Sequence, residues 1–232
     1  MPDGSKDRPE PTENLSEDSA LALLKNRNPS VGTVERIRKD ARLLKSRKVI
    51  VALVSHQKTP RHVSVPLLRQ LFTFDLMQVA LTPTVPADVK KAAEEVLIAR
   101  LESLSPGEKL SLARRASGRV AGVLLLDAEL RVIEAALENP HLTEAALAAS
   151  ILRDSYSAAL CEAVCRHSKW SLRRDVRLAL LKAGKTPESF AAQIAASLPA
   201  ELVRELLEIS NLSAATKSRI TEQLRAKEPS PQ

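Results

Sequence analysis

Two cysteines and four histidines have the side-chain types needed for metal binding or for nucleophilic catalysis. Cys161 and Cys165 lie four residues apart in SAALCEAVC, and that spacing places both thiols on one face of a helix. Together with His141 and His167 they would supply three or four ligands for a metal such as zinc. The surrounding alanines favour core packing instead, because free cysteine is among the most buried residue types. We therefore expect an apolar helix face with no metal and no cofactor.

Nucleophilic catalysis needs a base held by a third group, and the sequence shows no motif that supplies one. It contains no G-x-S-x-G, H-E-x-x-H or G-x-x-x-x-G-K-[ST] pattern, and its glycines do not cluster into a phosphate-binding loop. Asp127 and Glu129 form a carboxylate pair, although acidic residues placed in this way are more typical of a helix N-terminus. None of the histidines lies in a recognisable nucleophile context: His56, His62, His141 and His167. We expect a protein that is not an enzyme.

The basic residues are distributed unevenly along the chain. Residues 25–48 contain nine Lys or Arg against two acidic residues, a local charge of +7 that equals the formal charge of the whole chain. This asymmetry fits a face that tracks phosphates, a docking site for an acidic protein, or a solvated surface. The candidate partner-binding residues of this basic window are Arg36, Arg38, Lys39, Arg42, Lys45, Arg47 and Lys48.

The spacing within the basic window predicts one continuous amphipathic helix. Arg38, Arg42 and Lys45 follow an i, i+4, i+7 pattern, which places their charges together on one solvent-facing side. The buried side of this helix is predicted to consist of Val34, Ile37, Ala41 and Leu44.

A second group of candidate partner-binding residues surrounds the only tryptophan. It comprises Trp170, Arg173, Arg174 and Arg177. Their i, i+3, i+4, i+7 spacing aligns them along one side of a helix, where they could bind phosphates, carboxylates or a stacked base. However, Trp170 stands where Leu142 and Leu212 stand in similar segments, and tryptophan is highly buried on average. We therefore favour burial of the indole over exposure.

Helical periodicity extends through nearly all of the chain after residue 18. Apolar residues recur at three- and four-residue spacing, and no stretch alternates with a two-residue period between hairpin turns. Thr59 and Thr186 each precede a proline, which predicts an N-cap hydroxyl with proline at the first helical position. Ser105 and Glu108 predict a capping box. These signals indicate an all-α chain of about fourteen short helices.

One local pattern recurs between the predicted helices. A helix ends, a polar link follows, and an apolar or capping residue, which we call the anchor, comes before the next helix. The residues directly before the anchors are Lys58, Thr84, His141, Lys169, Lys185 and Asn211. They are separated by 26, 57, 28, 16 and 26 residues, which indicates a period near 26 to 29. That length holds two short helices, the unit that stacks in an α-solenoid. The short step of 16 predicts a unit with one helix missing or displaced.

The segments ENPHLTEAAL (138–147) and RHSKWSLRRDVRLALL (166–181) resemble the degenerate helical repeats of the HEAT-like and leucine-rich-repeat-variant class. The resemblance extends over roughly residues 20 to 225. It implies a HEAT-like right-handed α-solenoid that serves as a binding scaffold. Some leucine-rich-repeat-variant proteins carry a cysteine-rich iron–sulfur cluster, and this chain lacks those cysteines. Helical-repeat DNA glycosylases use a similar stack to cradle a duplex, and their active-site residues cannot be mapped onto this sequence.

The sequence predicts a disordered N-terminal tail over 1–17, a single α-helical repeat domain over 18–225 and a disordered C-terminal tail over 226–232. The polar start lacks signal-peptide features, no apolar run is long enough to span a membrane, and two cysteines fit a reduced cytoplasmic setting. The predicted function is a non-enzymatic protein–protein interaction scaffold, with an acidic protein as one candidate partner. The alternative is a nucleic-acid-backbone-binding protein that uses the basic faces at 25–48 and 166–177. The scarcity of aromatic residues argues against recognition of bases.

Overall fold

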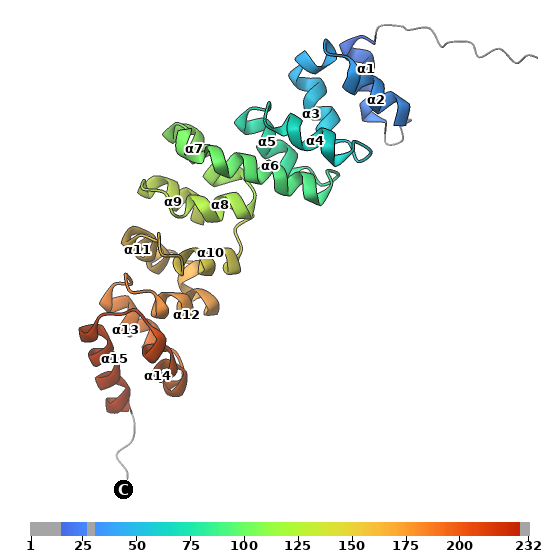
Figure 1. The fold of residues 1–232 in the computed structure, drawn as a ribbon. Coiled ribbons are helices and arrows are strands. Elements are labelled where there is room, and N and C mark those ends of the chain that lie inside the picture. The colour runs from blue at the N-terminus through green and yellow to red at the C-terminus, as the bar shows by residue number, and fades with distance from the viewer. Residues whose placement is uncertain (1–14, 27–30, 228–232) are drawn as a thin grey trace, which may run out of the picture. The chain divides into compact units, whose positions relative to one another are not determined.

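The computed structural model describes residues 15–26 and 31–227, and in these residues every regular element is a helix (Figure 1). Fifteen α-helices and three short 3-10 helices follow one another in these ranges, joined by links of a few residues. The predicted all-α class is therefore confirmed. None of the described helices combines the length and the apolar composition required to cross a membrane.

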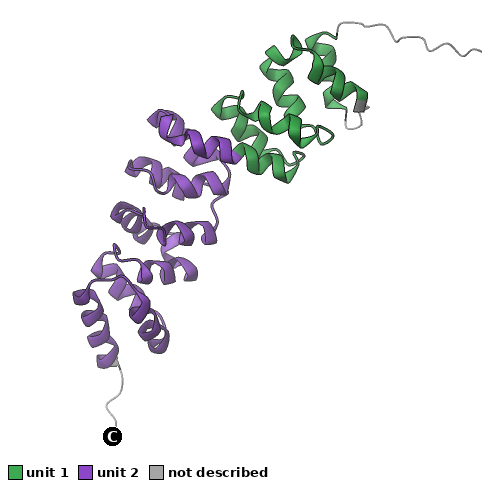
Figure 2. Ribbon diagram, in the orientation of Figure 1, with its two compact units in different colours: residues 1–93 green, residues 94–232 purple. Residues whose placement is uncertain are grey.

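The chain divides into two compact units, and the boundary falls inside α6 (Figure 2). The first unit, residues 1–93, contains α1 (Glu17–Lys25), α2 (Val31–Lys39), η1 (Leu43–Lys45), α3 (Arg47–Ser55), α4 (Arg61–Leu68), α5 (Thr73–Leu81) and the first half of α6 (Ala87–Arg100). The second unit, residues 94–232, continues with η2 (Leu101–Ser103), α7 (Pro106–Arg115), α8 (Gly118–Leu124), α9 (Leu130–Leu137), α10 (Glu144–Ile151), α11 (Ala158–Arg166), η3 (Trp170–Leu172), α12 (Arg174–Lys182), α13 (Glu188–Ala196), α14 (Ala200–Ile209) and α15 (Ala214–Lys227).

These boundaries differ from the predicted organisation. Where the sequence predicts one domain over 18–225, the contacts divide the chain at residues 93 and 94. The helical part starts one residue earlier, at Glu17, because Ser16 caps α1 by accepting the backbone amide of Ser19 at 3.1 Å. At the other end, α15 continues to Lys227. Most of both predicted tails, residues 1–14 and 228–232, lies outside the described residues.

In each unit, helices that are two apart in chain order pack side by side. In the first unit α3 lies against α1 and α5. In the second unit α9 lies against α7 and α11, and α10 lies against α8 and α12. Farther along, α14 packs on α12 and α15 packs on α13. These short helices thus bury their apolar stripes against a helix of the next pair, because so short a helix is not stable alone.

The link after α9 is tied to the end of α7 by one buried side chain. Asn139 is 1% exposed, and its Nδ2 donates to the carbonyl oxygens of Ala113 at 2.7 Å and Ala116 at 3.0 Å. Its Oδ1 accepts the backbone amide of His141 at 2.7 Å, which closes the link into a tight turn. The bonds to α7 satisfy carbonyl groups that a helix end leaves unpaired. Neighbouring links are therefore joined directly.

Histidines occupy the equivalent position in two other links. Nδ1 of His56 and of His167 accepts the backbone amide two residues later, at 3.1 Å in both cases. Because Nδ1 is the acceptor, Nε2 carries the proton of the neutral ring. Nε2 of His56 lies 3.2 Å from the carbonyl oxygen of Asn26 after α1, and Nε2 of His167 lies 3.1 Å from the Glu138 carboxylate after α9. Each ring thus connects the link after its own helix to the link after the helix two earlier in the chain.

The six anchor positions share one environment. Their exposed fractions lie between 2% and 6%. They are Thr59, Val85, Leu142, Trp170, Thr186 and Leu212. Residues chosen by sequence spacing alone therefore occupy buried places beneath the links, as expected for positions that start a new helix against the preceding pair.

The two Thr-Pro segments start helices, but the predicted role of the threonines is wrong. The hydroxyl of Thr59 donates to the carbonyl oxygen of Leu53, and that of Thr186 donates to the carbonyl oxygen of Leu180, each at 2.6 Å. The prolines are the N-cap residues, so α4 and α13 begin one residue later than predicted. A buried hydroxyl here donates to a carbonyl oxygen in the last turn of the preceding helix and does not accept an amide of the next helix.

The short step of 16 residues spans a single α-helix, α12. Lys169 lies in the link before α12 and Lys185 lies in the link after it, so both ends of one helix carry the recurring pattern. α12 packs on α10 and on α14. The steps of 26 and 28 residues each span two α-helices, so this unit has one α-helix fewer, as the sequence predicts. The additional feature is the one-turn helix η3, which contains Trp170.

Candidate functional site

Residues 31–48 of the basic window contribute to three helices, α2, η1 and α3, rather than to one. α2 ends at Lys39, Arg42 lies in the turn that follows, and η1 contains Lys45. The Asp40 carboxylate accepts the backbone amide of Arg42 at 2.9 Å, which stabilises a turn in competition with a continued helix. The predicted helix with Arg38, Arg42 and Lys45 along one side is therefore wrong.

The buried side of the basic window changes for the same reason. Val34 and Ile37 are buried, as predicted, because they lie on α2 before the turn. Ala41 is exposed, and Leu43 replaces Leu44 in the core. The turn shifts the buried positions by one residue. A helical spacing read from the sequence assumes an uninterrupted helix and therefore misses this shift.

Carboxylates neutralise three of the seven candidate residues in the basic window. The ion pairs are Arg38 with Glu35 at 2.7 Å, Arg42 with Asp40 at 3.0 Å and Arg47 with Asp75 at 2.6 Å. Hydrogen bonds from the arginine side chains hold the pKa of Glu35 and the pKa of Asp40 below their ordinary values. The other four are exposed and have no ion pair within residues 15–26 and 31–227: Arg36, Lys39, Lys45 and Lys48.

The ion pair of Arg47 connects α3 to α5. Asp75 is 5% exposed; Nη2 of Arg47 donates to its Oδ1 at 2.7 Å, and Nε lies 2.6 Å from its Oδ2. The guanidinium also lies over the ring of Phe72, 5.2 Å from the centroid. A buried carboxylate needs such a partner, because an isolated charge away from water is costly. Asp75 gave no signal in the sequence, since an acidic residue in the first turn of a helix is ordinary.

Two adjoining hollows form a groove over α3 in the first unit, which we call the α3 groove. Their volumes are about 800 Å³ and about 600 Å³, and α1 and α5 or its following link contribute to the walls. Both hollows include Ala52 and Ser55 of α3, and their small side chains leave a depression between the helices on either side. Arg47 and Lys48 line the first hollow, and Lys25 lines the second. Three basic residues of the basic window therefore border this concave surface.

The second candidate group does not form one surface. The indole of Trp170 is 2% exposed and its Nε1 donates to the carbonyl oxygen of Leu137 at 2.8 Å, which confirms its predicted burial. Arg173 and Arg174 are exposed at the start of α12. Arg177 is half-buried and its Nε donates to a backbone carbonyl oxygen of η3 at 2.8 Å. Because η3 interrupts the helix, the predicted alignment of these four residues along one side is wrong.

The two cysteines lie in the core of α11. Cys161 is fully buried and Cys165 is 7% exposed, which confirms the interpretation as core packing. Burial raises the pKa of Cys161 to about 11, although a hydrogen bond with Thr186 acts in the opposite direction. Burial also raises the pKa of Cys165, to about 12, with a further contribution from the neighbouring Cys161. In the described part of the chain, no three His, Cys, Asp or Glu side chains converge in a group that could hold a metal ion.

Both thiols are expected to react slowly with a disulfide reagent while the protein is folded. At about pH 8 a thiol with a pKa of about 11 is ionised in only about one molecule in a thousand, and the thiolate is the reacting species. In the unfolded chain the pKa returns to about 8.5, so both groups should react within seconds of adding denaturant. Absorbance of the released thiol anion measures both rates. Fast reaction of either thiol under native conditions would contradict its burial.

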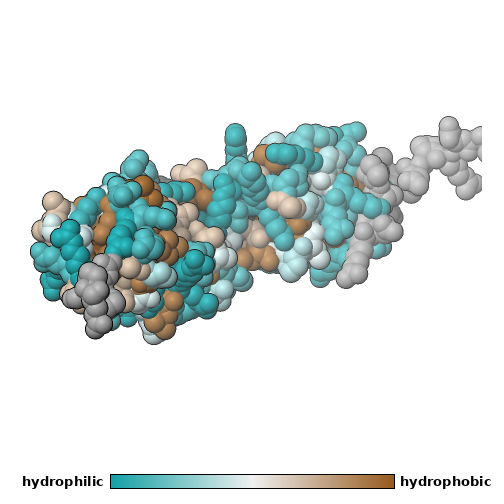
Figure 3. All heavy atoms as spheres, turned by 90° about the horizontal axis from the view of Figure 1, so that it is seen from below, coloured by the Kyte–Doolittle hydropathy of each residue, from teal (hydrophilic) through white to brown (hydrophobic). Residues whose placement is uncertain are grey.

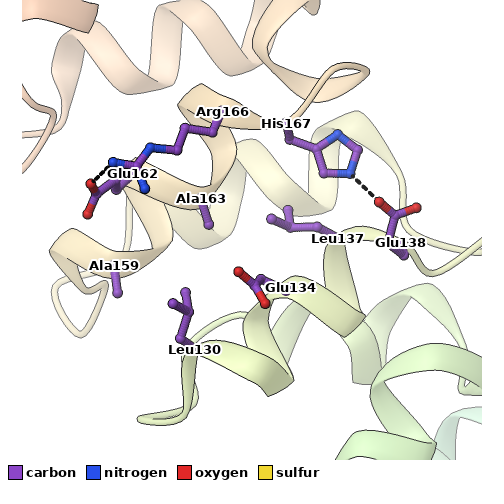
Figure 4. A pocket seen from close by; sticks show the side chains of 9 residues that line it. All are labelled: Leu130, Glu134, Leu137, Glu138, Ala159, Glu162, Ala163, Arg166 and His167. Carbon is purple, nitrogen blue, oxygen red and sulfur yellow. Dashed lines mark hydrogen bonds and ion pairs between the residues drawn. The ribbon is translucent and has the colours of Figure 1, made fainter.

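A further hollow lies between α9 and α11 in the second unit (Figure 4). Its volume is about 330 Å³, and we call it the α9–α11 hollow. Leu130, which is 48% exposed, lies at one end of the hollow, and the carboxylates of Glu134, Glu138 and Glu162 also line it. On the face seen in Figure 3, hydrophobic residues form small separate patches among hydrophilic ones. The sequence gave no signal for this hollow, because its two walls come from helices almost 30 residues apart.

The chain matches no protein-family model, no curated protein sequence and no solved structure.

Proposed function

We propose that this chain is a non-enzymatic protein–protein interaction scaffold of the cytoplasm, in which each unit is a segment of a HEAT-like right-handed α-solenoid. The side-by-side packing of helices two apart supports the solenoid, because stacked helix pairs bury their stripes in this way. Two unpaired cysteines support a reducing compartment. The observation that carries the binding function is the α3 groove, an open concave surface with a small-residue floor.

The shape of the α3 groove suits a helical or extended segment of a partner protein. Val51, Ala52 and Ser55 face the groove from α3, and their short side chains leave room between α1 and α5. Amphipathic helices bind in grooves of this kind by inserting apolar side chains at i, i+3 or i+4, and i+7. α3 has nine residues and is therefore about 13 Å long, which matches two to three turns of a bound helix.

The charges around the α3 groove favour a partner with acidic flanks. Lys25 and Lys48 are exposed and have no ion pair within the described residues. The carboxylates nearby are already engaged: Glu17 accepts a hydrogen bond from the hydroxyl of Ser46 at 2.8 Å, and Asp75 holds Arg47. A segment with Glu or Asp beside its apolar residues would therefore meet uncompensated positive charge, which favours association and orientation.

Fluorescence anisotropy with two labelled peptides of about 15 residues tests this proposal. Both peptides carry leucines at i, i+3 and i+7; one has glutamates at the flanking positions, and the other has lysines there. We expect the full chain to bind the acidic peptide more tightly than the basic one at this groove. Ala52→Arg fills the floor and should weaken binding of the acidic peptide at least about tenfold, and Lys48→Glu should weaken it several-fold. The matched controls Ala99→Arg and Lys91→Glu change exposed residues of α6 and should leave binding unchanged.

Two outcomes would overturn the protein-binding proposal. One is that Ala52→Arg and Lys48→Glu, both with an unchanged helical circular dichroism spectrum, bind the acidic peptide as the wild type does. The other is that duplex DNA binds at physiological salt while the acidic peptide does not, with an affinity that falls steeply with salt and with a shallower slope in Lys48→Glu. That result would replace a protein partner with a nucleic-acid backbone.

A further inference from the structure

We propose that the α9–α11 hollow is a second docking site, which receives a helical protein segment with an apolar side chain and a Lys or Arg next to it on the same face. The proposal extends the scaffold function to the second unit and to a partner of opposite charge. It rests on the proposed function only in assuming a protein partner, since no residue of the α3 groove takes part. Both walls of the hollow belong to the second unit.

The apolar part of the hollow has room for an inserted side chain. Ala159 and Ala163 lie four residues apart on α11, so their small side chains line the same wall. Leu130 and Leu137 of α9 form the opposite wall, and Leu130 has 48% of its surface exposed. Figure 4 shows Leu130 facing Ala159 across the opening. A volume of about 330 Å³ is sufficient for one large apolar side chain of a partner, which would cover the exposed part of Leu130.

The charges that line the hollow determine which charged side chain the partner should carry beside its apolar group. The side chain of Glu134 lies in the space between α9 and α11 and has no hydrogen bond or ion pair within the described residues (Figure 4). Glu162 is paired with Arg166 at 2.5 Å, and Glu138 lies 3.1 Å from His167. The hollow is thus lined by three carboxylates and by only one guanidinium, that of Arg166. A cationic side chain placed beside the inserted apolar group would give Glu134 the partner that it lacks.

The hollow is held in shape before any partner binds. His167 closes one end: its Nδ1 accepts the backbone amide of Lys169 at 3.1 Å, so the ring is fixed by its own link. Its Nε2 lies 3.1 Å from the Glu138 carboxylate, whose side chain is 75% exposed. The walls are also fixed, because α9 and α11 pack against each other and Leu137 is buried between the helices of this unit. A site formed in advance loses little conformational freedom on binding.

Anisotropy with the basic peptide described above tests this site in the full chain. We expect binding of the basic peptide to weaken at least about tenfold in Glu134→Lys and about threefold in Glu134→Gln, because the first reverses the charge and the second removes it. Ala163→Phe should weaken binding by filling the hollow while leaving every charge in place. Glu205→Lys is the matched control, since Glu205 is exposed on α14, has no ion pair within the described residues and lies outside the hollow.

The outcomes separate this site from the α3 groove. The acidic peptide should bind Glu134→Lys as tightly as the wild type, and the basic peptide should bind Ala52→Arg as tightly as the wild type. The docking site is ruled out if Glu134→Lys and Ala163→Phe both fold and bind the basic peptide normally, or if Glu205→Lys weakens binding as much as Glu134→Lys does. Sedimentation of the chain alone provides the last check. Self-association that Glu134→Lys abolishes would assign the hollow to a second copy and overturn the proposal of a separate partner.

Discussion

Replacing Trp170 with alanine is expected to lower the free energy of unfolding of the second unit by about 3–5 kcal/mol. The indole is 2% exposed and lies in the core beneath the link between α11 and α12. Its Nε1 donates to the carbonyl oxygen of Leu137, 33 residues earlier, so the side chain connects two neighbouring pairs of helices. The substitution removes a large buried ring and leaves that carbonyl unpaired. Urea denaturation followed by far-UV circular dichroism measures the change, since the variant lacks tryptophan fluorescence.

Two further variants separate packing from hydrogen bonding at this position. Trp170→Phe keeps an aromatic ring but loses the N–H group, so we expect a loss of about 1–3 kcal/mol, smaller than for alanine. Leu172→Ala changes a residue of the same one-turn helix that is 68% exposed, and it should change stability by less than about 0.5 kcal/mol. If Trp170→Ala were tolerated as well as Leu172→Ala, the ring could not be part of the core.

Gly118→Ala should destabilise the same unit by about 1–3 kcal/mol or more, because a methyl group at this position has no space. An added Cβ would lie 2.2 Å from the carbonyl oxygen of His141, which is a backbone atom of the link after α9. The start of α8 and this link would have to separate, and the hydrogen bonds that Asn139 donates to the carbonyl oxygens of Ala113 and Ala116 would be strained. Urea denaturation measures this effect in the same way as for Trp170.

Gly107→Ala provides the matched control for this steric effect. Gly107 lies in the first turn of α7, where an added Cβ would meet no atom within 4 Å. Alanine there should stabilise the protein by about 0.5–1 kcal/mol, because glycine loses more conformational freedom on folding. Gly184→Ala should behave like Gly118→Ala, since its Cβ would lie 2.4 Å from the carbonyl oxygen of Asn211 in another link. Stabilisation in Gly118→Ala would show that the links do not touch.

The helices and their buried stripes were predictable because the signals for them are local. The capping box of Ser105 and Glu108 is present, since it depends only on residues three apart. Trp170 is buried in the position that Leu142 and Leu212 also occupy, so a pattern of spacing was enough to predict its environment. The two cysteines are likewise buried among alanines of one helix. The capping box and the cysteine pair depend on residues of one helix, whose geometry fixes which side they share, and the burial of Trp170 follows from the recurring pattern.

Interactions between segments far apart in the chain could not be predicted in this way. Arg47 is held by Asp75, 28 residues later, and nothing in the spacing of the basic window distinguishes it from Lys48, which has no ion pair with any described residue. The hydroxyl of Thr59 donates to the carbonyl oxygen of Leu53 in α3, whereas the sequence equally allows an N-cap. The α3 groove and the α9–α11 hollow exist because helices from successive pairs lie side by side. Sequence spacing therefore specified the helices and their buried faces, and packing between the pairs determined which charges remain free and where concave surfaces form.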